Sequence, residues 1–572
     1  MKKNIPIYAL RALLITLPLC GCDAPPMKPY GLPGLSSWQP LEAPLVPANA
    51  DAYAATTAFR TLHGNSYNAD EVTLAYAPTF EQGWVSETHL YVPEGPTFDE
   101  QGNLYFSPLL PPENVLLVSL DHATGARRWA IAGKREGSGG APLVLPDPQQ
   151  PQKQLIYTGS YERIMAVTTD GNVLWDKPTG LIANGDNNAL LATHNYGVNF
   201  ISQQNALISV TGDGHIIALN RDTGDLLLPA VQIPGAPAES SSRMNLPSGV
   251  LQRANALLAP LFDADIAASG SLVQTLTSAL LGDGAVISNY FAADPNTGTL
   301  WIAATAPDTA DGVADGTAAY GALYAYRLEH TAQGYALNEQ CHVYYPGSSA
   351  STPTLSGDGQ RIYVGDSYHS LLAINTGCQT IWQLDVGSQI VGSVAVSQDN
   401  HEIYASTGLS VIKVIDEGNQ GRSVWKAAMD MFKTRPGQTS GNLNIAGVGA
   451  NGVMIQVGAG FAIKGQLLPL SIGVALLDRD TGKVRYATPG AEETVSVMSS
   501  NEDGALYLGH SPFRHALALA LTGKKTPVLG GIAQYRPQHT ELLVRDASCA
   551  AAIRLQNPAL AQFTPQQQQA NQ

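Results

Sequence analysis

Cysteines and histidines are the residues whose chemistry is easiest to recognise from spacing, because they serve as metal ligands, nucleophiles and proton carriers. The chain has 5 cysteines and 12 histidines in 572 residues. The mature domain has no adjacent cysteine pair and no C-x-x-C-H sequence, so no covalent haem site is indicated. No catalytic triad, zinc spacing or glycine-rich phosphate loop is evident. Single histidines on strands are more often structural than ligating, and they include His63, His194, His215, His369, His401, His510 and His515.

The first 22 residues read as a signal peptide. A basic start is followed by an apolar run over residues 5–19, which is too short to span a bilayer as a stable anchor. The next four residues, Leu19-Cys20-Gly21-Cys22, resemble a bacterial lipobox, in which a small residue precedes the lipidated cysteine. Gly21 fits that position and Leu19 is too large for it, so Cys22 is the expected lipid anchor. The alternative is an ordinary signal peptide with incidental cysteines.

Lipidation at Cys22 would hold the exported protein at a membrane surface. The expected location is therefore the periplasmic face of the inner or the outer membrane. Asp23 resembles the inner-membrane retention signal of enteric bacteria. Residues 23–84 are expected to form a tether and an N-terminal extension, whose last part either supplies a strand to the final repeat or caps one face.

The composition excludes one class of partner. The formal net charge is −15, with 44% hydrophobic and 14% charged residues. Nucleic-acid binding requires clustered Lys and Arg, so no nucleic-acid partner is expected. A length of 572 residues is too great for one compact domain unless that domain is a repeat or a barrel. The 56 glycines and 37 prolines are typical of an all-β protein with many turns.

A strand–turn–strand unit recurs at roughly 40–50 residues, which is the period of propeller blades. The clearest copy has the turn Asp121–Gly125 and ends in Trp129. The aspartate caps the turn and the glycine takes a positive φ. The sequence predicts an all-β propeller of about eight four-stranded blades over residues 85–537, with seven blades as the alternative. Further copies lie at Asp170-Gly171, Asn220–Gly224, Asn375–Gly377, Asp416 and Asp478–Gly482, and a degenerate last copy at Ala518–Gly523.

The pattern A-x-D-x-x-T-G-x-x-x-W resembles the tryptophan-docking repeat of quinoprotein (PQQ-like) β-propellers. The resemblance covers most of residues 91–537 and implies the fold, with Trp129, Trp175, Trp382 and Trp425 packing one blade against the next. The family includes quinone-dependent alcohol dehydrogenases and also non-catalytic lipoproteins of outer-membrane assembly. The fold alone therefore does not determine the activity.

Two catalytic alternatives follow from resemblance. Quinone-dependent relatives use a calcium site, a catalytic aspartate and often an adjacent cysteine pair, and this chain lacks that pair, so PQQ is not expected. Residues Glu94-Gly95-Pro96 resemble the first blade of gluconolactonase-like propellers, in which this glutamate binds a divalent metal such as calcium. Asn289 and Asp366 would complete that site, which implies a metal-dependent lactonase or esterase.

Two segments depart from the blade pattern. In residues 238–282, leucines recur at helical spacing, which predicts a helical insertion between the third and fourth blades. That insertion either covers one mouth of the propeller or docks a partner. Residues 538–572 are expected to hold a short helix and a disordered glutamine-rich tail.

The expected compartment permits a disulfide. Cys341 and Cys378 fall on neighbouring outer positions of the fourth and fifth blades, so a Cys341–Cys378 bond is predicted and Cys549 is left over. The preferred hypothesis is a non-catalytic scaffold that binds an envelope protein and is held to the membrane by its lipid. A hydrolase that uses Glu94 is the alternative, followed by a quinone-dependent dehydrogenase.

Overall fold

The structure is a computed structural model. It describes residues 30–31, 59–72, 76–77, 80–133, 138–183, 193–238, 246–281, 284–347, 351–390, 392–397, 401–429, 437–444, 447–449, 452–463, 466–490, 498–501 and 503–537. The signal peptide with Cys22, most of the tether and the tail with Cys549 lie outside the described residues.

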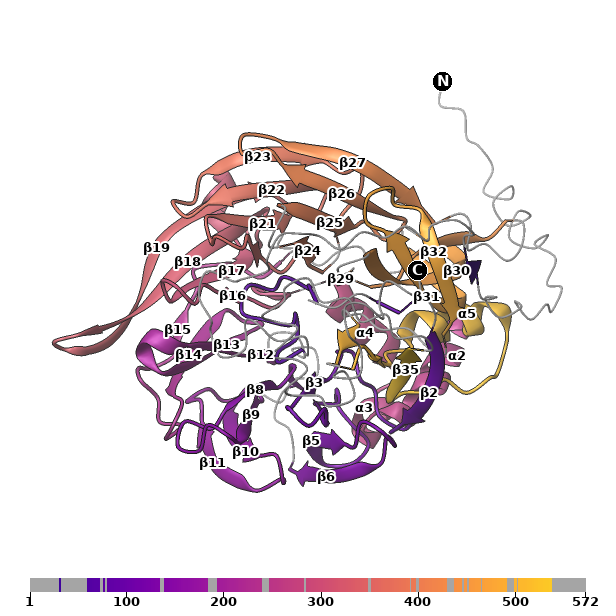
Figure 1. Cartoon of the computed structure of the whole chain (residues 1–572), viewed down its shortest axis with the longest axis horizontal. Helices are drawn as coiled ribbons and strands as arrows, with labels where there is room; N and C mark the ends of the chain where they lie inside the picture. The colour runs from indigo at the N-terminus through magenta and orange to yellow at the C-terminus, as the bar shows by residue number, and fades with distance from the viewer. Residues whose placement is uncertain are drawn as a thin grey trace, which may run out of the picture.

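Eight antiparallel sheets form a ring (Figure 1). The prediction of an all-β propeller with eight four-stranded blades is confirmed, and the seven-blade alternative is wrong. From the innermost strand outward, blade 1 is β3 (Thr97–Phe98), β4 (Leu104–Phe106), β5 (Val115–Leu120) and β6 (Arg127–Ala132). Blade 2 is β8 (Leu143–Pro146), β9 (Gln154–Gly159), β10 (Arg163–Thr168) and β11 (Val173–Pro178). Blade 3 is β12 (His194–Ile201), β13 (Ala206–Thr211), β14 (His215–Asn220) and β15 (Val231–Gln232), with β7 (Ser138–Gly139) beside β12.

Blades 4 to 8 follow the same order. Blade 4 is β16 (Ala292–Ala293), β17 (Thr299–Thr305), β18 (Tyr320–Thr331) and β19 (Gly334–Pro346). Blade 5 is β20 (Thr354–Leu355), β21 (Arg361–Gly365), β22 (Ser370–Asn375) and β23 (Thr380–Asp385), and blade 6 is β24 (Val394–Ser397), β25 (Glu402–Ser406), β26 (Ser410–Asp416) and β27 (Gly421–Ala428). Blade 7 is β28 (Thr439–Asn442) and β29 (Gly447–Gly449), then β30 (Gly452–Ile463), β31 (Gln466–Asp478) and β32 (Val484–Pro489), with β1 (Tyr30–Gly31) outside β32. Blade 8 is β33 (Ser499–Ser500), β34 (Leu506–Gly509), β35 (Ile532–Pro537) and β2 (Phe80–Ser86).

The ring is closed by the N-terminal extension. Strand β2 pairs antiparallel with β35, with Phe80 opposite Pro537, so the last blade takes its outermost strand from before the first blade. Residues 80–86 therefore supply a strand to the last blade, which is one of the two roles considered for the end of the N-terminal extension. Closure in this way leaves no unpaired seam between the first and last blades.

Tryptophan and glycine pack neighbouring blades together. The Trp129 indole donates a hydrogen bond to the Thr169 carbonyl at 3.0 Å, and its ring covers Gly171 of blade 2. A β-carbon on Gly171 would lie 2.8 Å from that ring, so glycine is required for contact as well as for its positive φ. The same pairing joins Trp175 to Gly224, Trp382 to Gly421 and Trp425 to Gly482.

A fifth tryptophan makes the same contact at the closure. The Trp84 indole donates to the His122 carbonyl at 2.9 Å and covers Gly125, where a β-carbon would lie 2.4 Å away. Trp84 was not predicted as a docking residue, because its strand ends at Ser86, whereas the other strands of its blade begin only at Ser499. One feature of the sequence could have revealed Trp84. The turn glycine of blade 1, Gly125, needs a tryptophan from a preceding strand to cover it, and no earlier blade supplies one.

Between blades 4 and 5 a covalent bond takes the place of the tryptophan. Cys341 lies inside β19, and Cys378 lies in the turn between β22 and β23; the two form a disulfide with Cα atoms 5.9 Å apart. The bond closes a loop with a sequence separation of 37 residues.

Replacing both Cys341 and Cys378 by serine is expected to lower the free energy of unfolding by about 4 kcal/mol, from the chain-entropy cost of a loop of this length. Urea denaturation of the oxidised protein, the reduced protein and the double variant measures it. The variant should match the reduced protein. A variant as stable as the oxidised protein would show that the disulfide does not constrain the unfolded chain.

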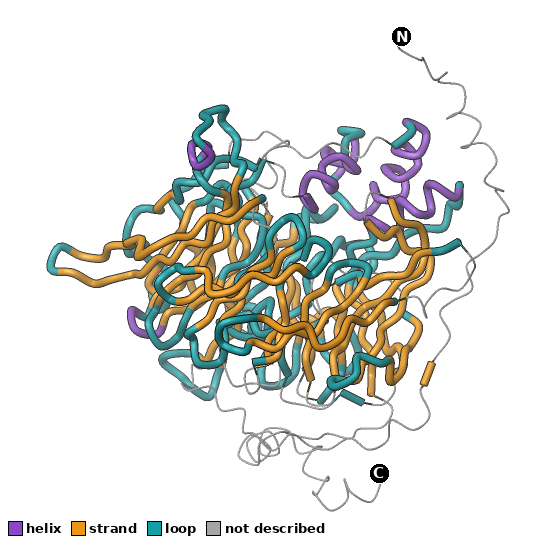
Figure 2. Tube along the Cα trace, turned by 90° about the horizontal axis from the view of Figure 1, so that it is seen from above, coloured by secondary structure: helices purple, strands orange, loops and turns teal. Residues whose placement is uncertain are grey.

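The longer helices that the structure describes gather on one face of the ring (Figure 2). The insertion forms α2 (Ser248–Leu258), η3 (Ala259–Leu261), α3 (Ala264–Ala268) and α4 (Leu272–Leu281), and a further helix, α5 (Phe513–Thr522), lies between β34 and β35. The other short helices are η2 (Ser202–Gln204) and η4 (Asp308–Asp311). The prediction that Ala518–Gly523 is a degenerate blade turn is wrong: the alternating Ala and Leu belong to α5, whose core-facing residues are buried, and Gly523 ends it at φ 73°.

The insertion reaches away from the blades that it connects. Val250, Leu258 and Leu276 share an apolar core with α5 of blade 8. Tyr91 at the start of blade 1 and Leu468 of blade 7 belong to the same core. The helices of the insertion thus cover blades 7, 8 and 1 on this face of the ring. Their apolar side chains are buried against other parts of the same chain. Of the two roles considered for the insertion, this arrangement supports covering the propeller over docking a partner.

Candidate functional site

The centre of the ring is occupied by the chain itself. Residues 59–72, here the channel segment, run around the axis inside the blades, as the indigo trace shows in Figure 1. Backbone hydrogen bonds join this segment to the innermost strands of seven blades. Its partners, in chain order, are Ser500 of blade 8, Phe98 of blade 1, Val144 of blade 2, Ala293 of blade 4, Leu355 of blade 5, Val396 of blade 6 and Val448 of blade 7.

The local sequence explains how a segment without regular secondary structure can follow this path. The side-chain oxygen of Asn65 accepts hydrogen bonds from the backbone N–H groups of Tyr67 and Ala69, at 3.1 and 3.2 Å. Asn68 and Asp70 have φ angles of 60° and 50°, a region that Asn and Asp tolerate better than other residues with a side chain. From Ser66 to Asp70, these turns direct the carbonyl groups outward, so that four of them reach blades 4, 5, 6 and 7 in turn.

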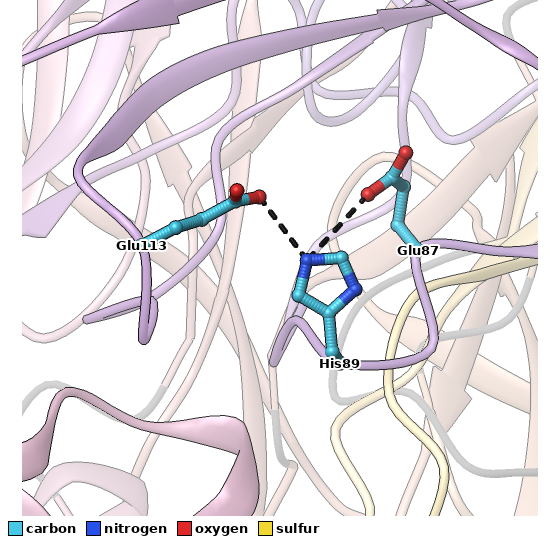
Figure 3. A group of neighbouring side chains, drawn as sticks. All are labelled: Glu87, His89 and Glu113. Atoms are coloured by element: carbon cyan, nitrogen blue, oxygen red, sulfur yellow. Dashed lines mark hydrogen bonds and ion pairs between the residues drawn. The ribbon is translucent and has the colours of Figure 1, made fainter.

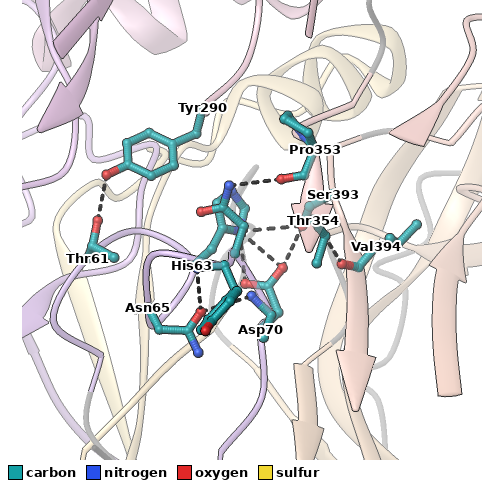
Figure 4. Close-up of polar contacts among 12 residues, drawn as sticks. Thr61, His63, Asn65, Asp70, Tyr290, Pro353, Thr354, Ser393 and Val394 are labelled. Carbon is teal, nitrogen blue, oxygen red and sulfur yellow. Dashed lines mark hydrogen bonds and ion pairs between the residues drawn. The ribbon is translucent and has the colours of Figure 1, made fainter. Parts of the chain in front are cut away.

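A buried cluster of His63, Asp70 and Ser393 locks the segment to blade 6 (Figure 4). The Nδ1 atom of His63 lies 2.8 and 3.0 Å from the two carboxylate oxygens of Asp70. The Ser393 hydroxyl donates to the second of these oxygens at 2.5 Å. All three side chains are almost fully buried.

These three residue types also form catalytic triads, but their arrangement here differs. In a triad the aspartate and the serine bind opposite ring nitrogens of the histidine, so that the histidine can take the serine proton. Here Ser393 donates directly to Asp70 and lies 3.4 Å from the same Nδ1 atom that Asp70 occupies. The cluster therefore holds backbone in place and does not activate the hydroxyl.

Tyr290 makes a second connection at the same level (Figure 4). Its hydroxyl donates to the Val198 carbonyl of blade 3 at 2.7 Å and therefore accepts the bond from Thr61 of the channel segment, also at 2.7 Å. This bond brings in blade 3, the one blade that the segment's backbone hydrogen bonds among the described residues do not reach. Burial raises the pKa of the Tyr290 phenol, so it stays a neutral hydrogen-bonding group.

Among the described residues, neither Glu94 nor Asp366 belongs to a group of three His, Cys, Asp or Glu side chains with the spacing of a metal site. Glu94 and Asn289 are half-buried and precede the innermost strands of blades 1 and 4. The charge of Glu94 adds to burial in raising the pKa of Tyr196. Asp366 uses one carboxylate oxygen to accept from three backbone N–H groups, those of residues 368, 369 and 370, at 2.7–2.9 Å, which closes the turn between β21 and β22. Such a turn explains the aspartate without a metal.

Among the described residues, one group of three side chains has the spacing of a metal site, and it is Glu87, His89 and Glu113 (Figure 3). The Nε2 atom of His89 lies 3.1 Å from Glu113 and 3.9 Å from Glu87. Arg127 already bridges the two carboxylates, with its Nη2 atom 2.7 Å from Glu113 and its Nε donating to Glu87 at 2.9 Å. Hydrogen bonding to Arg127 lowers the pKa of Glu113. This group is thus an ion-pair network that joins the end of β2 to blade 1, and it stabilises the closure of the ring between blades 8 and 1.

One buried histidine gives the protein a specific pH dependence. His510 is fully buried at the end of β34, and its Nδ1 donates to the Gly530 carbonyl at 3.1 Å. Its Nε2 has no hydrogen-bond partner among the residues that the structure describes. Burial lowers the pKa of His510 from 6.5 to about 4. The unfolded chain therefore binds the proton more readily than the folded one between pH 6.5 and 4, and stability is lost as the pH falls through this window.

Lowering the pH from 7.5 to 5 should accordingly cost about 2 kcal/mol of unfolding free energy through His510 alone. The variant His510→Asn keeps a donor for Gly530 and removes the titration, so its loss over the same interval should be smaller by that amount. Urea unfolding at the two pH values measures both. Equal pH dependence of the variant and the wild type would contradict the assignment.

No protein-family model matches this sequence, and no curated protein matches it. Among solved structures, a europium-containing methanol dehydrogenase is similar with a TM-score of 0.49 and 12% identity, covering 84% of this chain and 98% of that one. The quinohemoprotein alcohol dehydrogenase ADHIIG from Pseudomonas putida HK5 is similar with a TM-score of 0.46 and 11% identity, covering 86% and 82%. BamB from Moraxella catarrhalis is similar with a TM-score of 0.40 and 12% identity, covering 81% and 99%. At these values the likenesses carry no argument about function, and the propeller rests on the eight sheets themselves.

Proposed function

We propose that this chain is an exported, lipid-anchored β-propeller that acts as a non-catalytic scaffold or binding protein in the cell envelope. The lipid would be carried by Cys22, at the periplasmic face of the inner or the outer membrane. The partner would be an envelope protein.

The channel segment is the observation that carries this proposal. Propeller enzymes with a central site need an open space on the axis, where groups from several blades converge. Here the segment is hydrogen-bonded to the innermost strands of seven blades, and most of its side chains are buried. Polar groups that could otherwise face a substrate are used to hold the segment, as His63, Asp70 and Ser393 illustrate.

The disulfide between blades 4 and 5 also supports the proposal. The Cys341–Cys378 disulfide suits an oxidising compartment such as the periplasm. Over the part of the chain that the structure describes, no helix is long and apolar enough to cross a membrane. In this proposal the lipid on Cys22 provides the membrane attachment.

Metal and cofactor content tests the proposal. The chain from Ala24 to Gln572 would be purified without the lipid, and elemental analysis and an absorption spectrum would be taken on the same sample. We expect a folded, colourless protein without a stoichiometric divalent ion, and identical results for Glu94→Gln. A stoichiometric calcium or other divalent ion that is lost in Glu94→Gln would overturn the proposal in favour of the metal-dependent hydrolase. A quinone absorption band would overturn it in favour of the dehydrogenase.

A further inference from the structure

The two outer strands of blade 4 extend beyond the rest of the blade. Strands β18 and β19 have 12 and 13 residues, and β17 pairs with β18 only as far as Arg327. Beyond that point residues 328–338, here the blade 4 arm, continue as a two-stranded ribbon that projects from the rim in Figures 1 and 2. The outermost strands that complete the other blades have 2 to 8 residues.

The arm is held in a fixed shape by one of its faces. Leu328 and Leu337 lie opposite each other in the ribbon, are buried, and belong to the apolar core shared by blades 3 and 4. Nearer the tip, the rings of His330 and Tyr335 lie 4.6 Å apart. A two-stranded ribbon is marginally stable alone, so this packing is what keeps it formed. A partner that binds it does not have to order it first.

The outer edge of β19 is open along the arm. Among the described strands, β19 pairs with β18 alone. Thr331 and Gly334 flank a two-residue turn, so they form a hydrogen-bonded pair, and hydrogen-bonded pairs alternate with non-hydrogen-bonded pairs along the ribbon. The N–H and C=O groups of Tyr335, Leu337 and Glu339 therefore face away from β18.

Between Gly334 and Glu339, the edge of β19 lacks the usual protection. Natural proteins protect long edge strands with lysine, proline or a bulge that turns the edge away. From Gly334 to Glu339, β19 contains no Lys, Arg or Pro. Its bulge, at Gln340, and its one proline, Pro346, lie nearer the body of the blade. Other outermost strands carry such residues, for example β6 with two arginines and β11 with a lysine and a proline. An open edge of this length is a template for strand pairing.

We propose that the blade 4 arm binds an extended, lysine-bearing strand of a partner protein, which adds to β19 as a fifth strand of the blade. The propeller already accepts strands in this way, since β1 pairs with the outermost strand of blade 7. Glu329 and Glu339 are the charged residues of the region from 328 to 340, so a basic strand is favoured. The inference rests on the proposed scaffold function and names its binding surface.

The test uses the whole mature chain from Ala24 to Gln572 and a blocked nonapeptide that alternates lysine and valine. The peptide should slow amide hydrogen exchange at Tyr335, Leu337 and Glu339 at least tenfold. Tyr335→Pro removes an outward N–H at a position where proline is tolerated, and should weaken binding at least tenfold. Tyr335→Ala loses the ring but keeps the N–H, so it should bind within threefold of the wild type. The same peptide with proline at alternate positions should not bind.

Two results would overturn the inference. One is equal binding of the peptide by the wild type and Tyr335→Pro, provided that both unfold at the same temperature. The other is protection of the three amides in the protein alone as its concentration and mass rise, because the occupant would then be a second copy of this chain. Neither result bears on metal or cofactor content, so the scaffold proposal would still stand or fall by elemental analysis and absorption.

Discussion

Replacing Asp70 by alanine is expected to lower the free energy of unfolding by about 3–5 kcal/mol, the range found when one partner of a buried polar or ionic pair is removed. Asp70 is fully buried in the channel segment and holds both the His63 ring and the Ser393 hydroxyl. Without it, two buried polar groups lose their partner, and each carries the cost of its own desolvation. Alanine is also strained at the positive φ of 50° that this residue adopts.

Two variants separate these contributions. Asp70→Asn keeps a side-chain acceptor and tolerates the positive φ, so it should lose clearly less stability than Asp70→Ala. Ser393→Ala removes a single hydrogen bond and should cost about 1 kcal/mol. Urea unfolding at pH 7 compares all three with the wild type. If Asp70→Ala came within 1 kcal/mol of the wild type, the cluster would not be holding the segment.

Replacing Glu402 by glutamine should have an effect of similar size, about 3–5 kcal/mol, because it removes the negative charge that two buried cations share. Between blades 6 and 7, Glu402 lies 2.6 Å from Lys413 and 2.6 Å from Arg479, one on each carboxylate oxygen. The Tyr404 hydroxyl donates to it at 2.6 Å. All four side chains are buried.

The pH dependence of this cluster has a definite sign. Burial alone would raise the pKa of Glu402, but the charge of Arg479 and the bond to Lys413 outweigh it, so the pKa is lowered. The stability that Glu402 contributes is therefore complete above its unfolded pKa and is lost as the pH falls through the folded one. Glu402→Gln should lose this acid dependence as well as the stability.

The matched control lies on the same blade. Glu417 pairs with Arg422 on the exposed outer turn, and Glu417→Gln should leave unfolding in urea unchanged, since exposed pairs contribute little. Equal behaviour of Glu402→Gln and Glu417→Gln would contradict the role given to the buried cluster.

The blades could be predicted from the sequence because their signals are local. In blades 1 and 2, an aspartate, a glycine at positive φ and a tryptophan four residues after that glycine specify a turn, a strand and a docking ring within one stretch. Repetition of that stretch predicted both the blade number and the neighbouring positions of Cys341 and Cys378. The helical insertion was predictable for the same reason, since its leucines follow a helical period.

The channel segment could not be predicted in this way. Its residues, which begin Thr61-Leu62-His63-Gly64-Asn65-Ser66, have no apolar period. Local turns shape the segment, but the hydrogen bonds that place it in the ring are with strands far along the chain. Trp84 was missed for the same reason. In α5, the alternation of Ala and Leu is typical of a strand, so the sequence pattern alone predicts the wrong element. The helix is stabilised by packing against α2 and blade 7.

Hydrogen exchange at Leu355, Val396 and Val448 would test the central claim most directly. Their N–H groups donate to the carbonyls of Tyr67, Ala69 and Asp70, so the segment itself protects them. If the segment fills the channel, these amides should exchange as slowly as those of the buried strand β22 and only through opening of the blades. Exchange near the rate of an unprotected amide would contradict this result, because the segment would then leave the channel and expose the axis to a ligand.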